Sequence, residues 1–143
     1  MLRELLTHPL FLTILIAGGG AQLLKILFFL VRYKRLHTLD LVATGGMPSS
    51  HAALAVGLAV SVYLGEGLST AFFITLALAS IVLTDAMGVR RTAGQEGLLL
   101  HQLIRKTGLK LREPHYALGH TPAQVIVGAV FGFAVAVLIY FFL

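Results

Sequence analysis

Two histidines in this chain stand beside glycine and proline in short polar runs. His51 belongs to Gly45–Ala53, which reads Gly-Gly-Met-Pro-Ser-Ser-His-Ala-Ala, and His120 belongs to Gly-His-Thr-Pro-Ala-Gln. Proline suits the first turn of a helix, where its missing N–H is not needed. A helix N-terminus also carries unpaired N–H groups and a partial positive charge, both of which favour anions. The first run therefore predicts a helix start that can bind phosphate, and the second repeats its glycine, histidine and proline.

The first run contains two hydroxyl side chains that could assist. Pro48 is predicted to lie in the first helical turn, so that Ser49 and Ser50 lie among the unpaired backbone N–H groups. Their hydroxyls can donate further hydrogen bonds to an oxyanion. His51 can gain or lose a proton near neutral pH. The alternative interpretation is a capped helix start with an incidental histidine.

Basic side chains accompany the apolar segments of the chain. Lys25 lies inside one such segment, where it either extends to the membrane surface or faces inward and binds an anion, and Arg32 ends the same segment. Asp85, Arg90 and Arg91 come together at the end of another segment. These three form either a structural ion pair or part of a site that holds phosphate oxygens.

Phosphoryl transfer is the reaction that would use all these residue types. A neutral histidine can attack phosphorus and form a phosphohistidine, while a protonated one gives its proton to the departing alcohol. His120 and Gln124 are four residues apart, so Gln124 can orient His120 at a helix start. Arginines, a lysine and serines would neutralise the phosphate charge. We predict no metal site and no cofactor, because Asp85 and Glu113 are the only carboxylates near these residues and make no ligand pattern.

Composition indicates a membrane protein. The 143 residues are 57% hydrophobic and 12% charged, the mean hydropathy is +0.90, and there is no cysteine. Residues 1–143 are therefore predicted to form a single integral membrane domain, an all-α bundle. A spanning helix needs about 20 apolar residues. The second apolar segment, Ala52–Leu64, is shorter than this, so we expect Pro48–His51 to lie below the membrane surface. The four predicted spans are Leu10–Val31, Ala52–Leu64, Leu68–Val89 and Ala123–Leu143.

The long connection between the last two spans, residues 90–122, carries leucines that alternate with Arg105, Lys106 and Lys110. This pattern predicts an amphipathic helix on the membrane surface. Four alternating spans bring both histidines to one membrane face, together with nine of the eleven Lys and Arg residues. Basic loops stay inside, so this face is predicted to be cytoplasmic, in an inner or plasma membrane. Nucleic acid is not an expected partner, because too little of the chain lies outside the bilayer.

Together these residues resemble the divergent branch of the type 2 phosphatidic acid phosphatases, which are related to vanadium-dependent haloperoxidases. The resemblance is strongest over Gly45–Ala53, Asp85–Gly94 and Leu118–Gly128. The main family carries the motifs K-x6-R-P, P-S-G-H and S-R-x5-H-x3-D. Lys25 and Arg32 have the spacing of the first motif, although Tyr33 replaces its proline and Arg35 remains a rival for the arginine.

The resemblance also implies roles for the residues of the other two motifs. Pro48–His51 matches the second motif with serine in place of glycine, which would make His51 the general acid. His120 would be the nucleophile, with Gln124 where the family has an aspartate. Arg90 or Arg91 would supply the arginine of the third motif across an expanded loop.

The function that this resemblance implies is metal-independent hydrolysis of a lipid phosphate: phosphatidate, phosphatidylglycerophosphate or a polyprenyl phosphate. Membrane lipids are the other expected partners, and a homo-oligomer is compatible with the sequence. The alternative is a non-catalytic binder or transporter that uses the same cations to hold an anionic lipid head group. A purely structural membrane protein would leave both histidines unexplained.

Overall fold

The computed structural model describes residues 1–33, 46–108, 111 and 118–143, and this part of the chain contains six helices and no strand. The expectation of an all-α protein is confirmed. Arg35, Lys110, Glu113 and most of the loop before the first histidine lie outside the described residues. In chain order the helices are α1 (Leu2–Thr7), α2 (Pro9–Tyr33), α3 (Ser50–Glu66), α4 (Thr70–Met87), α5 (Val89–Thr107) and α6 (Pro122–Phe142).

Four of these helices form the membrane bundle. By length and composition α2, α4 with its continuation α5, and α6 can each cross a membrane. The remaining one, α3, is apolar but has only 17 residues, which gives about 25 Å of helix against a hydrocarbon core of about 30 Å. The expectation of about four spans is confirmed, with α3 the shortest. The recessed position of its first residues below the membrane surface stays a prediction.

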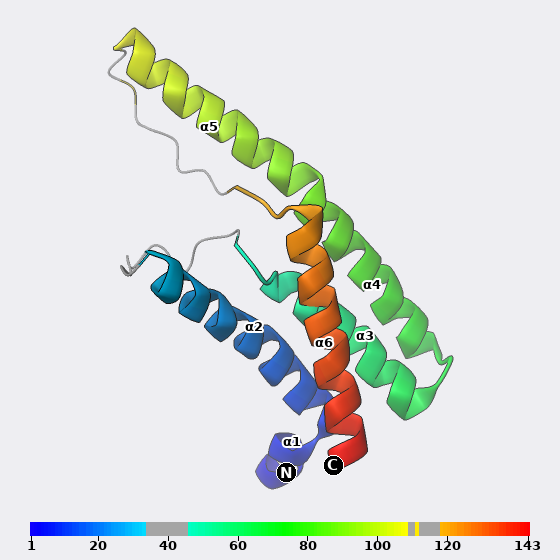
Figure 1. The fold of residues 1–143 in the computed structure, drawn as a ribbon. Helices are drawn as coiled ribbons and strands as arrows, with labels where there is room; N and C mark the ends of the chain where they lie inside the picture. Colours follow the sequence, from blue (N-terminus) through cyan, green and yellow to red (C-terminus); the bar gives the residue numbers. More distant parts are fainter. Residues whose placement is uncertain (34–45, 109–110, 112–117) are drawn as a thin grey trace.

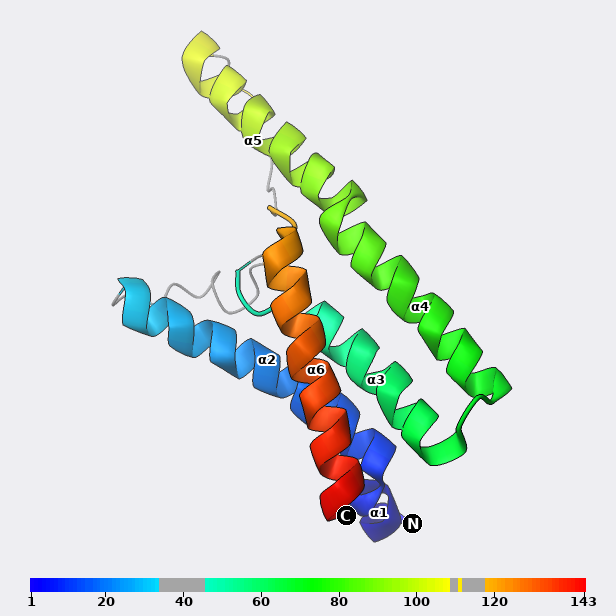
Figure 2. The ribbon, with the colours of Figure 1, turned by 45° about the vertical axis from the view of Figure 1, so that its right-hand side comes forward.

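The short helix α3 is the centre of the bundle. It packs against α2, α4 and α6, whereas α2 and α4 do not contact each other within the described part of the chain. Figures 1 and 2 show α2 and α4 on either side of α3. Small residues allow these approaches, since the side of α3 that is buried consists of Ala52, Ala53, Ala55, Gly57, Ala59 and Val62.

The amphipathic helix expected after the third span is present as α5. It begins at Val89, directly after the single joint residue Gly88, and it continues beyond the start of α6 (Figure 1). Its early start places Arg90 and Arg91 within its first turn rather than in a loop. Its position on the membrane surface stays a prediction.

Two glycines of α6 allow its close contact with α3. A Cβ at Gly128 would collide with the backbone carbonyl of Ser49, and a Cβ at Gly132 with that of Ala53. Small residues four apart let membrane helices approach to backbone contact. The start of α3 is therefore pressed against the first half of α6.

The glycines of α2 differ in what they face. A Cβ at Gly18 would lie 2.9 Å from Cδ1 of Leu54, and a Cβ at Gly20 would lie 3.2 Å from Phe131. At Gly19 a Cβ would meet nothing within 4 Å. The expected close packing thus applies to Gly18 and Gly20, which face α3 and α6, and not to Gly19, which faces outward.

Gly132→Ala should destabilise the protein, although alanine is the better helix former. The added methyl group collides with the Ala53 carbonyl, and overpacking of this kind costs about 1–3 kcal/mol. The matched control is Gly19→Ala, which adds the same group where nothing lies within 4 Å. Thermal unfolding in detergent should show a lower melting temperature for Gly132→Ala alone. Equal melting temperatures for the two variants would contradict the close contact.

Candidate active site

His51 is the second residue of α3, and Ser49 fixes the start of that helix. The Ser49 hydroxyl oxygen accepts a hydrogen bond from Ala52 N–H at 3.3 Å. The Ser49 N–H donates to the carbonyl of Gln124 at 3.1 Å. The prediction that Pro48 lies in the first helical turn is wrong, because Ser49 is the N-cap and Pro48 precedes it. Serine is favoured at the N-cap position because its hydroxyl oxygen can accept a hydrogen bond from an unpaired N–H group.

His120 is positioned by its own backbone and by the glycine before it. Its N–H donates to the carbonyl of Ala86, near the end of α4, at 3.1 Å. A Cβ at Gly119 would lie 2.6 Å from Cα of Arg91, so the approach to the start of α5 requires glycine. These contacts hold the segment before α6 against the junction of α4 and α5, where the expected arginines lie.

The side chain of Gln124 fixes the orientation of the His120 ring. Its Oε1 accepts from Thr121 N–H at 3.0 Å and lies 3.3 Å from Nδ1 of His120. Because a backbone N–H can only donate, the amide atom that it meets is the oxygen. In neutral His120 the proton is then on Nδ1 and the lone pair on Nε2. The expected pairing of His120 with Gln124 is confirmed.

Thr121 also contributes to the site, and this contribution was not predicted from the sequence. Its hydroxyl oxygen accepts from Gln124 N–H at 3.3 Å, which completes a capping box at the start of α6. The spacing Thr-x-x-Gln before an apolar run is a known signal for this motif. Gln124 therefore has two tasks, since it stabilises the helix start and holds His120.

The two imidazole rings line one cavity. Their centroids are 6.4 Å apart, and His120 is only 2% exposed. The cavity has a volume of about 170 Å³, and its polar lining consists of His51, His120, Asp85 and Arg90. The structure therefore brings together four predicted site residues from α3, α4, α5 and the segment before α6.

Arg90 and Asp85 form an ion pair in the lining of this cavity. Nη2 of Arg90 lies 3.1 Å from Oδ2 of Asp85, and the two side chains are 40% and 39% exposed. The structural ion pair that the sequence left open is thus present. It leaves room for a ligand, because a guanidinium has five N–H donors. Arg91 does not line the cavity, and its backbone instead supports Gly119.

Lys25 faces the inside of the bundle, with only 4% of its surface exposed. A Cβ at Gly46 would lie 3.3 Å from Cδ of this lysine, and Gly46 has a φ of 87°, which favours glycine. Lys25 therefore extends toward the segment before α3 and not toward lipid. Arg32 lies two turns further along, in the last turn of α2, and its role stays a prediction.

Burial lowers the pKa of the His120 imidazole below its ordinary value of 6.5. The side chain of Gln124 and the backbone of Gly46 raise this pKa, whereas the charges of His51 and Lys25 lower it further. The lowered pKa favours a neutral ring at neutral pH. A neutral ring has the lone pair that a nucleophile needs.

The two serines of the first run lie in different surroundings. Ser49 is completely buried at the contact with α6, so its observed task is structural. Ser50 is half-buried and lines a second, more apolar cavity that also reaches His51. Binding of phosphate by either hydroxyl stays a prediction. Among the described residues there is no group of three or more His, Cys, Asp or Glu that could hold a metal ion.

Known sequences resemble this chain over most of its length. The sequence profile described as the divergent PAP2 family matches residues 6–135. A protein of Bacillus subtilis (strain 168), described as the uncharacterized membrane protein YuiD, is 33% identical over an alignment of 160 positions, which covers 98% of this chain and 99% of that protein. No solved structure matches the chain. This integral membrane protein therefore belongs to the divergent PAP2 family.

Proposed function

We propose that this protein is a membrane phosphatase that hydrolyses the phosphomonoester of a lipid phosphate, such as phosphatidate, phosphatidylglycerophosphate or a polyprenyl phosphate. The observation that carries the proposal is the cavity that His51, His120 and Arg90 share. The family supports the same chemistry, because its description relates the chain to the PAP2 phosphatases. The spanning helices make a lipid the natural form of the substrate.

In the proposed reaction His120 is the nucleophile. Its Nε2 lone pair attacks phosphorus, so that an N–P bond forms while the bond between phosphorus and the lipid oxygen breaks. Gln124 keeps Nδ1 in place during the attack. An amide oxygen orients the ring but does not neutralise the imidazolium as a carboxylate does. We therefore expect slower chemistry than in phosphatases with aspartate at this position.

His51 is the proposed proton donor and acceptor. In its protonated form it gives a proton to the departing lipid oxygen, which leaves as an alcohol. Neutral His51 then takes a proton from a water molecule that attacks the phosphohistidine. Inorganic phosphate leaves, and both histidines return to their starting states. The two ring centroids are 6.4 Å apart and both rings line the same cavity, which supports this division of roles between the two histidines.

Side-chain cations supply the positive charge in this proposal. Arg90 lines the cavity, and Asp85 holds its guanidinium in place. Lys25 is buried close enough to lower the pKa of His120. Such preorganised charges stabilise the phosphoryl transition state without a bound divalent metal. The further proposed substrate ligands are Arg32, Ser49 and Ser50.

Binding or transport of an anionic lipid without hydrolysis is the second candidate. The observation that favours it is Gln124, a neutral group where the related phosphatases have aspartate. The same cations would then hold a head group with no transfer of phosphate.

For either function we propose that the site faces the cytoplasm, because basic segments stay on that side.

The purified protein should release inorganic phosphate from a lipid phosphate in the presence of a chelator, and vanadate should block the release. Vanadate can imitate the five-coordinate transition state for which the site is built. Phosphate release from phosphatidate, phosphatidylglycerophosphate and a polyprenyl phosphate is measured with and without chelator. Activity lost with chelator and restored by magnesium would contradict the metal-independent mechanism. Tight binding of all three lipids without release would favour the second candidate.

Arg90→Ala should reduce kcat/KM far more than Arg91→Ala. Neighbouring helical residues point about 100° apart, and only Arg90 lines the cavity with the histidines. Loss of one donor to the transition-state charge costs roughly 10²–10³ in rate, which is our expectation for Arg90→Ala. The measurement is steady-state kinetics of the two variants, and equal melting temperatures serve as the control that both are folded. Equal and small losses would remove both arginines from the site.

A further inference from the structure

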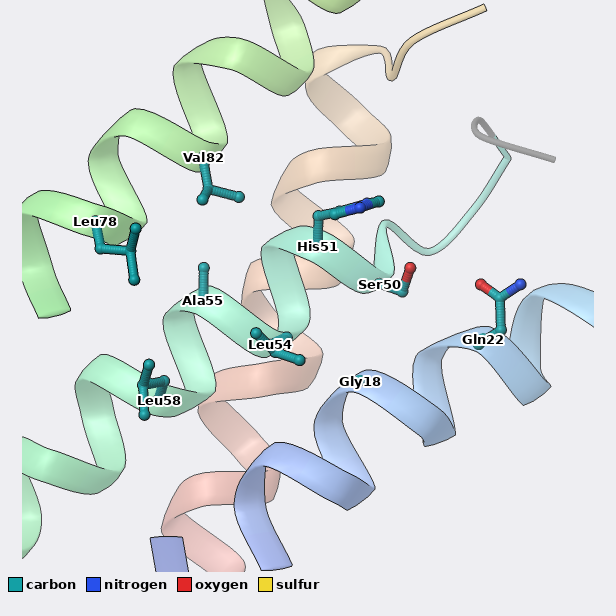
Figure 3. Close-up of a pocket in the computed structure, with 9 residues that line it drawn as sticks. All are labelled: Gly18, Gln22, Ser50, His51, Leu54, Ala55, Leu58, Leu78 and Val82. Atoms are coloured by element: carbon teal, nitrogen blue, oxygen red, sulfur yellow. The ribbon is translucent and has the colours of Figure 1, made fainter. Parts of the chain in front are cut away.

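A second cavity of about 340 Å³ adjoins the candidate active site (Figure 3). It lies over α3, between α2 and α4, which do not contact each other in the described part of the chain. Two of its leucines, Leu54 and Leu78, are 38% and 47% exposed. The cavity is therefore a groove that opens toward the surroundings of the bundle, which are lipid for spanning helices.

The polar and apolar residues of the groove are separated along its length. Gln22, Ser50 and His51 lie at one end, and Leu58 and Leu78 line the other, as Figure 3 shows. His51 and Leu58 are two turns apart on α3, about 10 Å along the helix axis. This arrangement matches a molecule with a polar head and a hydrocarbon tail.

The groove is continuous with the candidate active site. His51 and Val82 line both cavities, and the other one holds His120 and Arg90. When the phosphate of a lipid lies beside His120, its hydrocarbon chain can therefore lie in the groove, because no helix separates the two cavities. A Cβ at Gly18 would lie 2.9 Å from Cδ1 of Leu54, so a larger residue there would displace a side chain that lines the groove.

We propose that this groove holds a hydrocarbon chain of the lipid phosphate, and that the substrate enters sideways from the bilayer between α2 and α4. The inference rests on the proposed function, because it assigns the tail of the same substrate. Gln22 and Ser50 then lie beside the group that links the chain to the phosphate. An unrelated bilayer lipid and a helix of a second copy are the competing occupants, and the experiments below separate them.

The first experiment narrows the groove and compares dioleoyl phosphatidate with butyl phosphate. Leu78→Trp adds bulk in the groove. The matched control is Leu76→Trp, also on α4. Leu76 is 44% exposed and Leu78 is 47% exposed, but Leu76 does not line the groove. For Leu78→Trp we expect the ratio of kcat/KM for the long-chain over the short-chain substrate to fall about tenfold or more. Leu76→Trp should keep the wild-type ratio. An unchanged ratio in Leu78→Trp would overturn the assignment.

The second experiment measures occupancy without turnover. A phosphatidate with a photoreactive group in its acyl chain is irradiated with the His120→Ala variant in micelles, and the labelled peptides are mapped by mass spectrometry. We expect labels near Leu58 and Leu78, displaced by dioleoyl phosphatidate but not by dioleoyl phosphatidylcholine. Equal displacement by phosphatidylcholine, or cross-linking of a second copy at these positions, would overturn the groove assignment. Specific labelling in a protein that hydrolyses nothing would support the groove and contradict only the phosphatase.

Discussion

The contact between the start of α3 and the first half of α6 is the constraint on which the candidate active site depends. Gly128 and Gly132 leave room for backbone carbonyls of α3 that any side chain would strike. The contact brings Ser49 N–H to 3.1 Å from the Gln124 carbonyl. Because the side chain of Gln124 also holds His120, this backbone contact and the Gln124 side chain together set the separation of the two histidines.

Other backbone contacts tie the charged residues to the same place. His120 N–H meets the Ala86 carbonyl, and Gly119 lies against the backbone of Arg91, so the junction of α4 and α5 carries Arg90 into the cavity. A buried lysine is costly among apolar helices unless an anion or polar group is near it, and Lys25 lies on the same side. Cations and histidines at one end, with an apolar groove beside them, suit a phosphorylated lipid.

The spans, and the membrane face that both histidines share, were predicted well from the sequence. In lipid every backbone group must be paired within its own helix, so each long apolar run marks one spanning helix. The predicted span Ala123–Leu143 differs from α6 by one residue at each end. The close contact between α6 and α3 was harder to predict. The spacing of Gly128 and Gly132 indicates that another helix approaches closely, but it does not show which helix. Whether Arg90 or Arg91 enters the cavity depends on the joint at Gly88, for which hydropathy carries no signal.

The most direct test of the account is to trap the phosphoenzyme. Purified protein is mixed with phosphatidate that carries radioactive phosphate, denatured at alkaline pH to preserve phosphohistidine, digested and mapped. We predict acid-labile phosphate on His120, none in His120→Ala, and slower formation in His51→Ala, where the departing lipid oxygen lacks its proton donor. Wild-type turnover in His120→Ala, or phosphate on a different residue, would contradict the central claim that His120 is the nucleophile.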